Sequence, residues 1–281
     1  MSCYNPPIDK PERTFALHVQ RFDPAAGDAK PQWEALQIPW VVTMTVIQAL
    51  EWCQDQGQYV AFRANCREFT CGSCAMLING KPALACDTPL ADNMRLQPLN
   101  RYPVKKDLVV DTSAVRQKWR ALELWPKDRS GEPLRDVPRE SLEGWHRSFA
   151  RCIECYACLD ACPASEADAS PFAGPMWMLQ IARARAHPRD AHDRLTQAVD
   201  QGIGRCVSCY ECADVCPVGL SPVSEINRLR LAVLGEYVKG WATKLRLRAA
   251  PQTLANAAEP DLGSAPVRES DVSSARPESG R

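Results

Sequence analysis

Residues 66–86 read CREFTCGSCAMLINGKPALAC, a stretch that combines four cysteines with a signal for a hairpin. The four cysteines are Cys66, Cys71, Cys74 and Cys86. Their spacing, C-x4-C-x2-C with a remote fourth cysteine, is that of a plant-type [2Fe–2S] site. Asn79 and Gly80 are typical of the tight turn between two short antiparallel strands. The stretch therefore predicts a metal-binding loop that leads directly into a β-hairpin.

The flanking sequence predicts a small α+β fold around this loop. The expected strands cover residues 15–22, 33–40, 75–79, 83–86 and 108–110. A helix is expected from a cap at Thr43 or Thr45 to about Gln56, and Gly57 is expected to end it. The apolar side of this helix consists of Val46, Ile47, Leu50 and Cys53. Strands that flank one helix, with cysteines in a loop beside it, indicate a ferredoxin-like domain.

Two further cysteine runs repeat one another. CIECYACLDACP (152–163) and CVSCYECADVCP (206–217) share the pattern C-x2-C-x2-C-x3-C-P. This is the bacterial two-cluster ferredoxin pattern, in which the fourth cysteine of each run ligates the other cluster. Three ligands from one tight loop cover one side of a cubane, and the fourth cysteine, just before a proline, is directed away. One cluster is therefore expected on Cys152, Cys155, Cys158 and Cys216. The other is expected on Cys206, Cys209, Cys212 and Cys162.

Two other uses of fourteen cysteines compete with this interpretation. A disulfide framework is typical of small secreted chains, whereas this chain has 281 residues and its first fifteen contain no apolar signal segment. Structural zinc suits paired C-x2-C ligands, but zinc sites usually close after two pairs. Here three cysteines follow at x2 spacing and a fourth precedes proline. Analysis of metal and acid-labile sulfide would separate the alternatives, because zinc sites hold no sulfide.

Charge and hydropathy exclude several classes of partner. The chain has 34 basic and 34 acidic side chains without a block of one sign, so nothing favours nucleic acid or an anionic surface. Its longest uncharged run, residues 35–50, contains Pro39 and is too short and polar to span a bilayer. The chain is expected to be soluble in itself, in a reducing compartment where cysteines hold metal.

Four segments are expected along the chain. A [2Fe–2S] domain at 1–112 is followed by a helix and exposed connector at 113–144, a helical two-cluster domain at 145–245, and a disordered Pro-, Ser- and Ala-rich tail at 246–281. Ser113 is expected to cap the helix before the connector.

A late helix is expected to begin at Ser221 and Pro222. The residues expected on its buried side are Ile226, Leu229, Val233 and Tyr237.

The remaining reactive or apolar residues are expected to be structural. Cys3 and Cys53 lie outside the three sets, and residues 174–179 (GPMWML) are expected to pack around the clusters. The sequence contains no Ser–His–Asp set, glycine-rich phosphate loop or paired catalytic carboxylates. No catalytic residue is therefore assigned, and substrate conversion is expected in a partner.

These motifs together resemble the iron–sulfur subunit of the succinate dehydrogenase / fumarate reductase family. The resemblance covers about residues 13–240 and includes the three cysteine stretches and YPVKKDLVVD at 102–111. It implies an α+β architecture, with an N-terminal plant-type ferredoxin domain of β-grasp form followed by an all-α bacterial-type two-cluster domain. It also implies [2Fe–2S], [4Fe–4S] and a third cluster, which relay electrons in a respiratory complex of the tricarboxylic acid cycle. The implied partners are a FAD-containing subunit and membrane-anchor subunits with quinone, which would hold the chain on the inner face of the cell membrane, on the cytoplasmic side.

Three departures from the family pattern concern the third cluster. Family members commonly lack a cysteine at the position of Cys209 and then carry [3Fe–4S]; a fourth thiolate here favours [4Fe–4S]. Glu166 and Ala167 stand where the dehydrogenases have a Trp pair, and Val207 stands where a His is common. The usual quinone pocket is therefore not supported. The alternative is the same relay serving another flavoprotein dicarboxylate oxidoreductase with a soluble, non-quinone partner.

Overall fold

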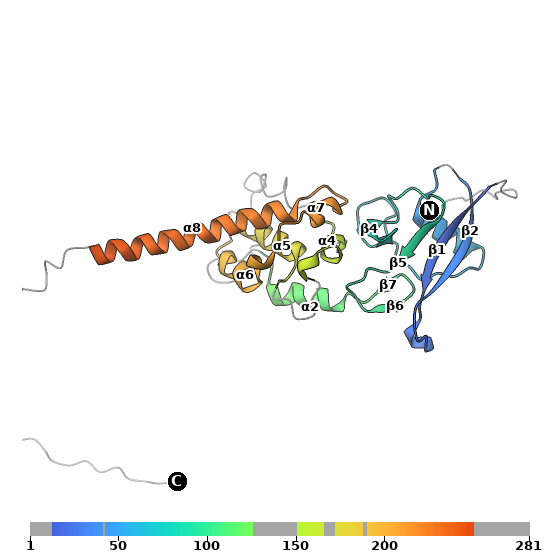
Figure 1. Cartoon of the computed structure of the whole chain (residues 1–281), viewed down its shortest axis with the longest axis horizontal. Helices are drawn as coiled ribbons and strands as arrows, with labels where there is room; N and C mark the ends of the chain where they lie inside the picture. The colour runs from blue at the N-terminus through green and yellow to red at the C-terminus, as the bar shows by residue number, and fades with distance from the viewer. Residues whose placement is uncertain (1–12, 42, 126–150, 166–171, 188–189, 250–281) are drawn as a thin grey trace, which may run out of the picture. The chain divides into compact units, whose positions relative to one another are not determined.

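The computed structural model describes residues 13–41, 43–125, 151–165, 172–187 and 190–249, with no side chains described at 242–249 (Figure 1). The predicted connector at 126–144 lies outside the described residues, as does the predicted tail beyond residue 249. The chain divides into a compact unit at 1–237 and a second unit at 238–281. The cysteine sets all lie in the first unit.

A five-stranded mixed sheet forms the N-terminal half of the first unit. The strands are β1 (Thr14–Arg21), β2 (Gln32–Pro39), β3 (Ala75–Ile78), β4 (Lys81–Leu84) and β5 (Met94–Gln97). Their order is β2-β1-β5-β3-β4, in which β1 and β5 run parallel and the other neighbours antiparallel. The predicted hairpin forms at Asn79 and Gly80, which both have positive φ. The predicted strands at 15–22, 33–40, 75–79 and 83–86 are therefore confirmed to within a few residues.

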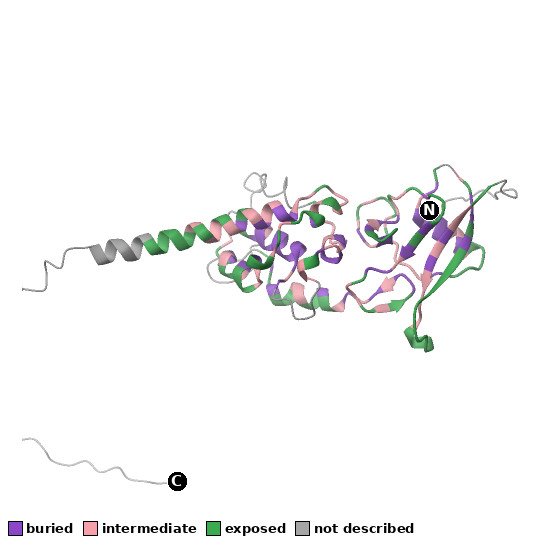
Figure 2. Ribbon diagram, viewed as in Figure 1, coloured by how far each residue is buried: buried purple, intermediate pink, exposed green. Residues whose placement is uncertain are grey.

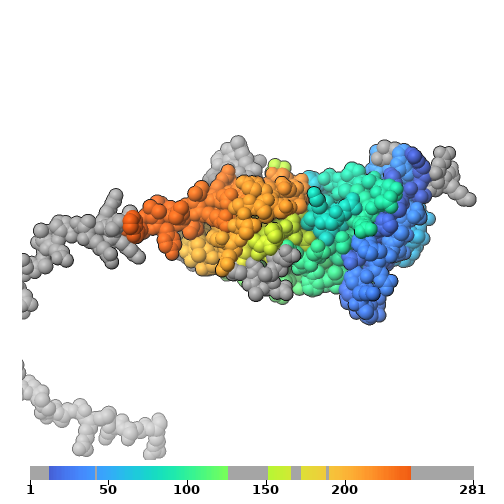
Figure 3. Space-filling model, in the orientation of Figure 1, coloured from blue at the N-terminus to red at the C-terminus, as the bar shows by residue number. Residues whose placement is uncertain are grey.

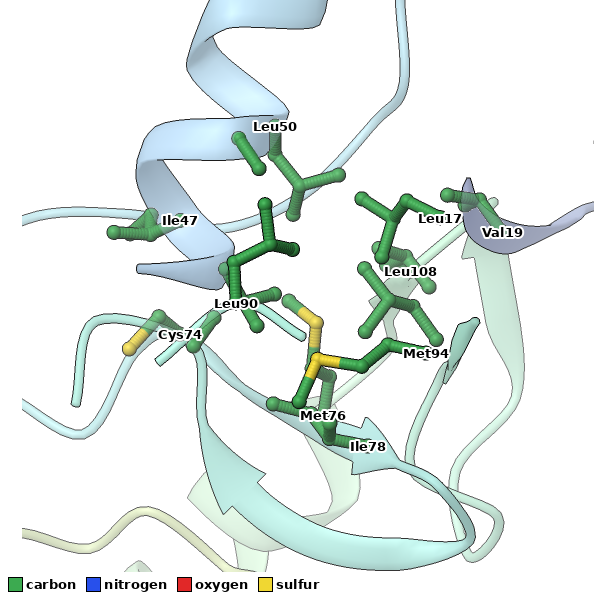
Figure 4. Close-up of a cluster of buried hydrophobic side chains, with 14 of the residues drawn as sticks. Leu17, Val19, Ile47, Leu50, Cys74, Met76, Ile78, Leu90, Met94 and Leu108 are labelled. Atoms are coloured by element: carbon green, nitrogen blue, oxygen red, sulfur yellow. The ribbon is translucent and has the colours of Figure 1, made fainter. Parts of the chain in front are cut away.

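Helix α1 (Val46–Asp55) covers this sheet and completes the β-grasp arrangement. Thr45 and Gln48 form a capping box at its start, and the helix ends before Gly57 as predicted. The predicted apolar side is buried and packs with residues of the sheet, as Figure 4 shows for Leu50 beside Leu17. This burial fixes the helix beside the loop that carries the first cysteines.

The sequence does not reveal every strand of this half. β5 has only four residues and, unlike β3 and β4, is not joined to a partner strand by a tight turn, yet it lies at the centre of the sheet. A separate two-stranded sheet consists of β6 (Val104–Lys106) and β7 (Val109–Val110), of which the sequence predicts only the second, and η1 (Pro24–Ala26) is a short 3₁₀ turn. Asp107 in the turn between β6 and β7 is buried and accepts amide hydrogens from Phe22 and Ala61.

The second half of the unit is helical among its described residues. Its elements are α2 (Ser113–Leu122), α4 (Ala157–Asp160), η3 (Pro163–Ser165), α5 (Pro175–Arg185), α6 (Arg194–Asp200), η4 (Ile203–Arg205), α7 (Glu211–Asp214) and the part of α8 (Pro222–Ala249) up to residue 237. Helix α5 is buried on nearly all sides and forms the centre of a second hydrophobic cluster. The expectation that residues 174–179 are core packing is confirmed.

Helix α8 begins at Pro222, next to Ser221, as predicted, but its buried side is shorter than predicted. Ile226 and Leu229 are buried and Val233 is partly buried, whereas Tyr237 is 78% exposed. The prediction that Tyr237 is buried is therefore wrong, because α8 extends beyond the core against which its first turns pack. Figure 2 shows this change along α8 from buried to exposed residues. The helix continues to Ala249, past the predicted start of the tail.

The two halves of the first unit contact each other directly. Arg101 donates from Nε to the Asp160 carbonyl (3.0 Å) and from its terminal nitrogen to the Cys162 carbonyl (2.5 Å). Its backbone amide also donates to the Asp160 carboxylate (3.0 Å). Figure 3 shows atoms of residues 151–165 against those of the first half. These bonds join the two cysteine-bearing halves.

Candidate metal centres

The first cysteine loop is shaped to hold thiolates. Arg67, Phe69 and Gly72 have positive φ, which turns successive amides toward the inside of the loop. The amides of Glu68, Thr70 and Cys71 lie 3.3–3.4 Å from the Cys66 sulfur. Hydrogen bonds from the Thr70 side chain, the Glu68 amide and Cys71 lower the pKa of Cys66 to about 6. The loop thus stabilises a ligand in its metal-binding form.

Strand pairing brings the other cysteines of the first set together. The Ala85 amide donates to the Cys74 carbonyl (3.2 Å), which extends the β3–β4 ladder and sets Cys86 beside Cys74. Cys74 lies at the edge of the core in Figure 4, and burial raises its pKa to about 12. The Cys66 amide is 3.5 Å from the Cys71 sulfur, and Cys71 and Cys86 both act on the Cys74 thiol, so the four residues are neighbours. A buried thiol of this kind ionises only with a cationic partner such as iron.

The Ser73 hydroxyl is expected to raise the reduction potential of the first centre. Its hydroxyl oxygen lies 3.1 Å from the Cys71 sulfur, so the hydroxyl can donate to a thiolate there. Ser73→Ala removes a donor that stabilises the more negative, reduced state. A loss of about 1 kcal/mol corresponds to a potential lower by about 40 mV. A redox titration followed by EPR measures this change. Ser208→Ala removes a hydroxyl from the last cysteine run and should leave the first centre unaltered; an equal shift there would refute the effect.

The two later cysteine runs surround two separate cavities. One cavity is lined by Cys152, Cys155, Cys158 and Cys216, together with Met176 and Leu179 of α5. The other is lined by Cys162, Cys206, Cys209 and Cys212, together with Val223 and Ile226 of α8. Each cavity thus combines three cysteines of one run with the last cysteine of the other. Within the described part of the chain, no three His, Cys, Asp or Glu side chains converge on a point suited to a single metal ion.

The two runs have the same backbone conformation. Glu154 and Tyr156 of the first run have φ of 52° and 67°, and the equivalent Ser208 and Tyr210 have 55° and 69°. Each run then continues into a single helical turn, α4 or α7. Residues other than glycine seldom adopt positive φ, so both runs contain the same local backbone strain at the residues between their cysteines.

The surroundings of the two runs differ. Cys155 is buried, whereas the equivalent Cys209 is exposed. Val207 and Tyr210 beside it are 67% and 52% exposed. The first run is covered by the N-terminal half, and the last run opens to the surface. All thirteen cysteines in the described residues are free, and Cys53 is buried in the core of the β-grasp half.

Burial raises the pKa of three cysteines of the two later runs. It raises the pKa of Cys155 to about 11 and that of Cys212 to about 12. It raises the pKa of Cys158 well above the ordinary value, and neighbouring cysteines add to the effect. Three buried thiols whose raised pKa values keep them neutral in isolation fit sites that iron and sulfide complete.

Two arginines that sequence reasoning did not identify hold the cysteine loops in place. Arg101 binds the end of the first run, as described above, and Arg230 of α8 binds the start of the last. Arg230 donates to the carbonyls of Ile203 (3.2 Å), Gly204 (3.3 Å) and Cys206 and to the Ser208 hydroxyl (3.1 Å). No local pattern marks either residue, because both act across 20 or more positions of sequence.

Comparison with known proteins agrees with this two-part arrangement. Residues 16–117 match the family model of a 2Fe–2S iron–sulfur cluster binding domain, and residues 148–220 match that of a 4Fe–4S dicluster domain. The fold and sites thus define a protein with a plant-type ferredoxin domain followed by a bacterial-type one. These models favour iron–sulfur clusters over the zinc and disulfide alternatives.

Several relatives are similar over most of this chain. The fumarate reductase iron–sulfur subunit of Mycobacterium tuberculosis is 33% identical over 80% of this chain and 95% of its own length. The succinate dehydrogenase iron–sulfur subunit of Bacillus subtilis is 31% identical over 78% and 92%. A solved chain of the Mycobacterium smegmatis Sdh1 complex in the apo form superposes with a TM-score of 0.70 and 26% identity, over 79% of this chain and 96% of that one. The chain belongs to the family of iron–sulfur subunits of succinate dehydrogenases and fumarate reductases.

A further relative is longer than this chain. It is a subunit of the fumarate reductase (CoM/CoB) of Methanothermobacter marburgensis and is 35% identical over 76% of this chain, which spans only 43% of that protein.

Members of the family carry [2Fe–2S], [4Fe–4S] and a third cluster, and the chain accordingly carries these cofactors. None of the helices described here is long and apolar enough to cross a membrane.

Proposed function

We propose that this chain is the iron–sulfur electron-transfer subunit of a complex like succinate dehydrogenase or fumarate reductase. It relays electrons one at a time between a FAD-containing subunit, where succinate and fumarate interconvert, and a distal partner. A cluster held by four thiolates supplies the one-electron chemistry. The observation that carries the proposal is the order of three four-cysteine sets in a chain of this family.

The proposed ligands are the twelve cysteines of the three sets. The [2Fe–2S] cluster is assigned to Cys66, Cys71, Cys74 and Cys86. The [4Fe–4S] cluster is assigned to Cys152, Cys155, Cys158 and Cys216. The third is assigned to Cys162, Cys206, Cys209 and Cys212. The two cavities described above support the exchange of fourth cysteines between the runs. The proposed domains remain those expected from the sequence, at 1–112, 113–144 and 145–245, except that the last extends to Ala249, where α8 ends.

The third centre is proposed to be [4Fe–4S] and to face the distal partner. Cys209 supplies a fourth thiolate, and its exposure leaves it on the open side of the cavity. The first run, of the same conformation, is covered by the N-terminal half, and the exposed Val207 and Tyr210 give the last run a comparable apolar surface without a cover among the described residues. An external electron carrier docked there would cover the last run as the N-terminal half covers the first.

The identity of the distal partner has two candidates. Quinone at membrane-anchor subunits is the family expectation, and with it a position at the inner face of the cell membrane. A partner other than quinone is favoured by the relative named for CoM/CoB and by the fourth cysteine at the third centre. In that case the same relay serves a different flavoprotein dicarboxylate oxidoreductase.

Purification without oxygen from the native source tests this function. We expect a FAD-containing subunit to accompany the chain, and succinate to reduce the clusters, or fumarate to reoxidise them, only in its presence. Added quinone then oxidises the third centre if quinone is the partner. A chain that carries clusters but neither binds a flavoprotein nor responds to either dicarboxylate would refute the proposal.

A further inference from the structure

Gly72 is the point where the first cysteine loop meets the second. It lies between Cys71 and Cys74, with φ of +67°. A Cβ added there would lie 2.7 Å from the Ile153 carbonyl oxygen and 2.9 Å from the Cys155 Cβ. Both distances are shorter than a carbon atom tolerates, and the oxygen belongs to rigid backbone. The absence of a side chain at residue 72 therefore allows the two loops to approach this closely.

The contact has a direct relation to the relay. Cys71 and Cys74 belong to the first set, and Cys155 belongs to the second. Beside the contact the same loops separate and line a cavity of about 360 Å³, whose walls include residues 71–75 and 152–156. Gly72 and Cys155 therefore lie at a point of close packing between the two loops, directly beside this cavity.

We propose that Gly72 is a positioning residue that sets the separation of the first two clusters and thereby the rate of electron transfer between them. This inference rests on the proposed function. One electron leaves the reduced centre on one loop and reduces the centre on the other, without a proton or a leaving group. A side chain at residue 72 forces the loops apart, since about 0.7 Å of retreat is needed for the added carbon to reach ordinary contact with the Ile153 oxygen at 3.4 Å. A longer gap slows the transfer.

Gly80 supplies a matched control in the same domain. Its φ is +79°, so alanine there is strained in the same way, but a Cβ at Gly80 has nothing within 4 Å. Gly72→Ala and Gly80→Ala therefore share the backbone cost and differ in the close approach to the second loop.

The experiment compares the full chain with these two variants after anaerobic cluster loading. Iron and sulfide are counted first, and photoreduced deazaflavin then reduces both clusters. The magnetic interaction between the reduced [2Fe–2S] and [4Fe–4S] clusters, measured by EPR, falls as the inverse cube of their separation. We expect a clear splitting in the unaltered chain, the same splitting in Gly80→Ala, and a smaller one in Gly72→Ala. Transfer between the two clusters should be several-fold slower in Gly72→Ala alone.

Each other outcome overturns the inference. Equal splittings in the two variants show that the separation does not depend on residue 72. Selective loss of the first cluster in Gly72→Ala makes Gly72 a requirement for cluster binding instead of spacing. A loaded, unaltered chain without magnetic interaction shows that the clusters are not close, whatever the variants do. In all three cases the proposed function survives, whereas a chain that binds no iron or sulfide refutes that function itself.

Discussion

Replacing Cys209 by serine is expected to remove one iron from the third centre and to raise its reduction potential. The other three cysteines of that set remain to hold a three-iron cluster, and a serine hydroxyl is a poorer ligand for iron than a soft thiolate. Loss of one thiolate also removes negative charge beside the cluster, which favours the reduced state. Iron analysis should fall by about one atom per chain. The oxidised variant should show the paramagnetic signal of a three-iron cluster, which the unaltered anaerobic protein lacks.

Val207→Ala provides the control for this experiment. Val207 lies in the same loop and is exposed, but it has no ligand atom, so iron content and potential should stay as they are. If Cys209→Ser leaves both quantities unchanged, Cys209 is not a ligand. A strong three-iron signal in intact, anaerobically prepared protein would contradict the assignment of [4Fe–4S] to the third centre.

Removal of Arg194 is expected to cause a large loss of stability, because its side chain is part of a buried ion pair. The side chains of Arg194 and Asp190 are each 1% exposed and form a two-point ion pair, with N–O distances of 2.7 and 3.3 Å. Arg194 also donates to the carbonyls of Glu123 (3.1 Å) and Trp125 (2.9 Å), and so ties the end of α2 to α6. Arg194→Ala leaves a buried carboxylate without its main cation and should cost about 3–5 kcal/mol. The melting temperature of the loaded protein should fall by about 6 °C or more.

Arg228→Ala is the matched surface change. Arg228 pairs with Glu225 on α8 but is 70% exposed, and exposed pairs contribute about 0–1 kcal/mol. The melting temperature of the Arg228→Ala variant should stay within about 2–4 °C of that of the unaltered protein. The double replacement Asp190→Leu with Arg194→Met should recover much of the loss, because it removes both charges together. A small effect of Arg194→Ala would show that water reaches the pair.

The sequence predicts the local elements of this fold well, because their signals are local. The hairpin at residues 79 and 80, helix α1 and the start of α8 each depend on a turn, a cap or a periodic stripe within a few residues. β5 is not predicted because its partners, β1 and β3, are distant in sequence and no hairpin turn marks its pairing. The prediction for Tyr237 fails because a periodic stripe indicates which side of a helix is apolar, but does not indicate where the neighbouring core ends.

In the candidate sites too, local features can be predicted from the sequence, whereas long-range contacts cannot. Cysteine spacing predicts how the twelve cysteines divide into sets, because a cluster imposes its geometry on a short loop. The residues that join the loops act at long range. Arg101 reaches the first cubane run from the β-grasp half, and Gly72 contacts Ile153 and Cys155 some eighty positions away. Only the packed structure brings these residues to the cysteines, so neither role has a signal in the sequence.

The most direct test of the central claim is an iron and acid-labile sulfide count on the full chain isolated without oxygen. Three clusters on twelve cysteines predict about ten irons per chain and sulfide in equal number, with the visible absorbance of iron–sulfur proteins. A colourless chain that holds zinc without sulfide, or that takes up neither iron nor sulfide on anaerobic reconstitution, would contradict the account.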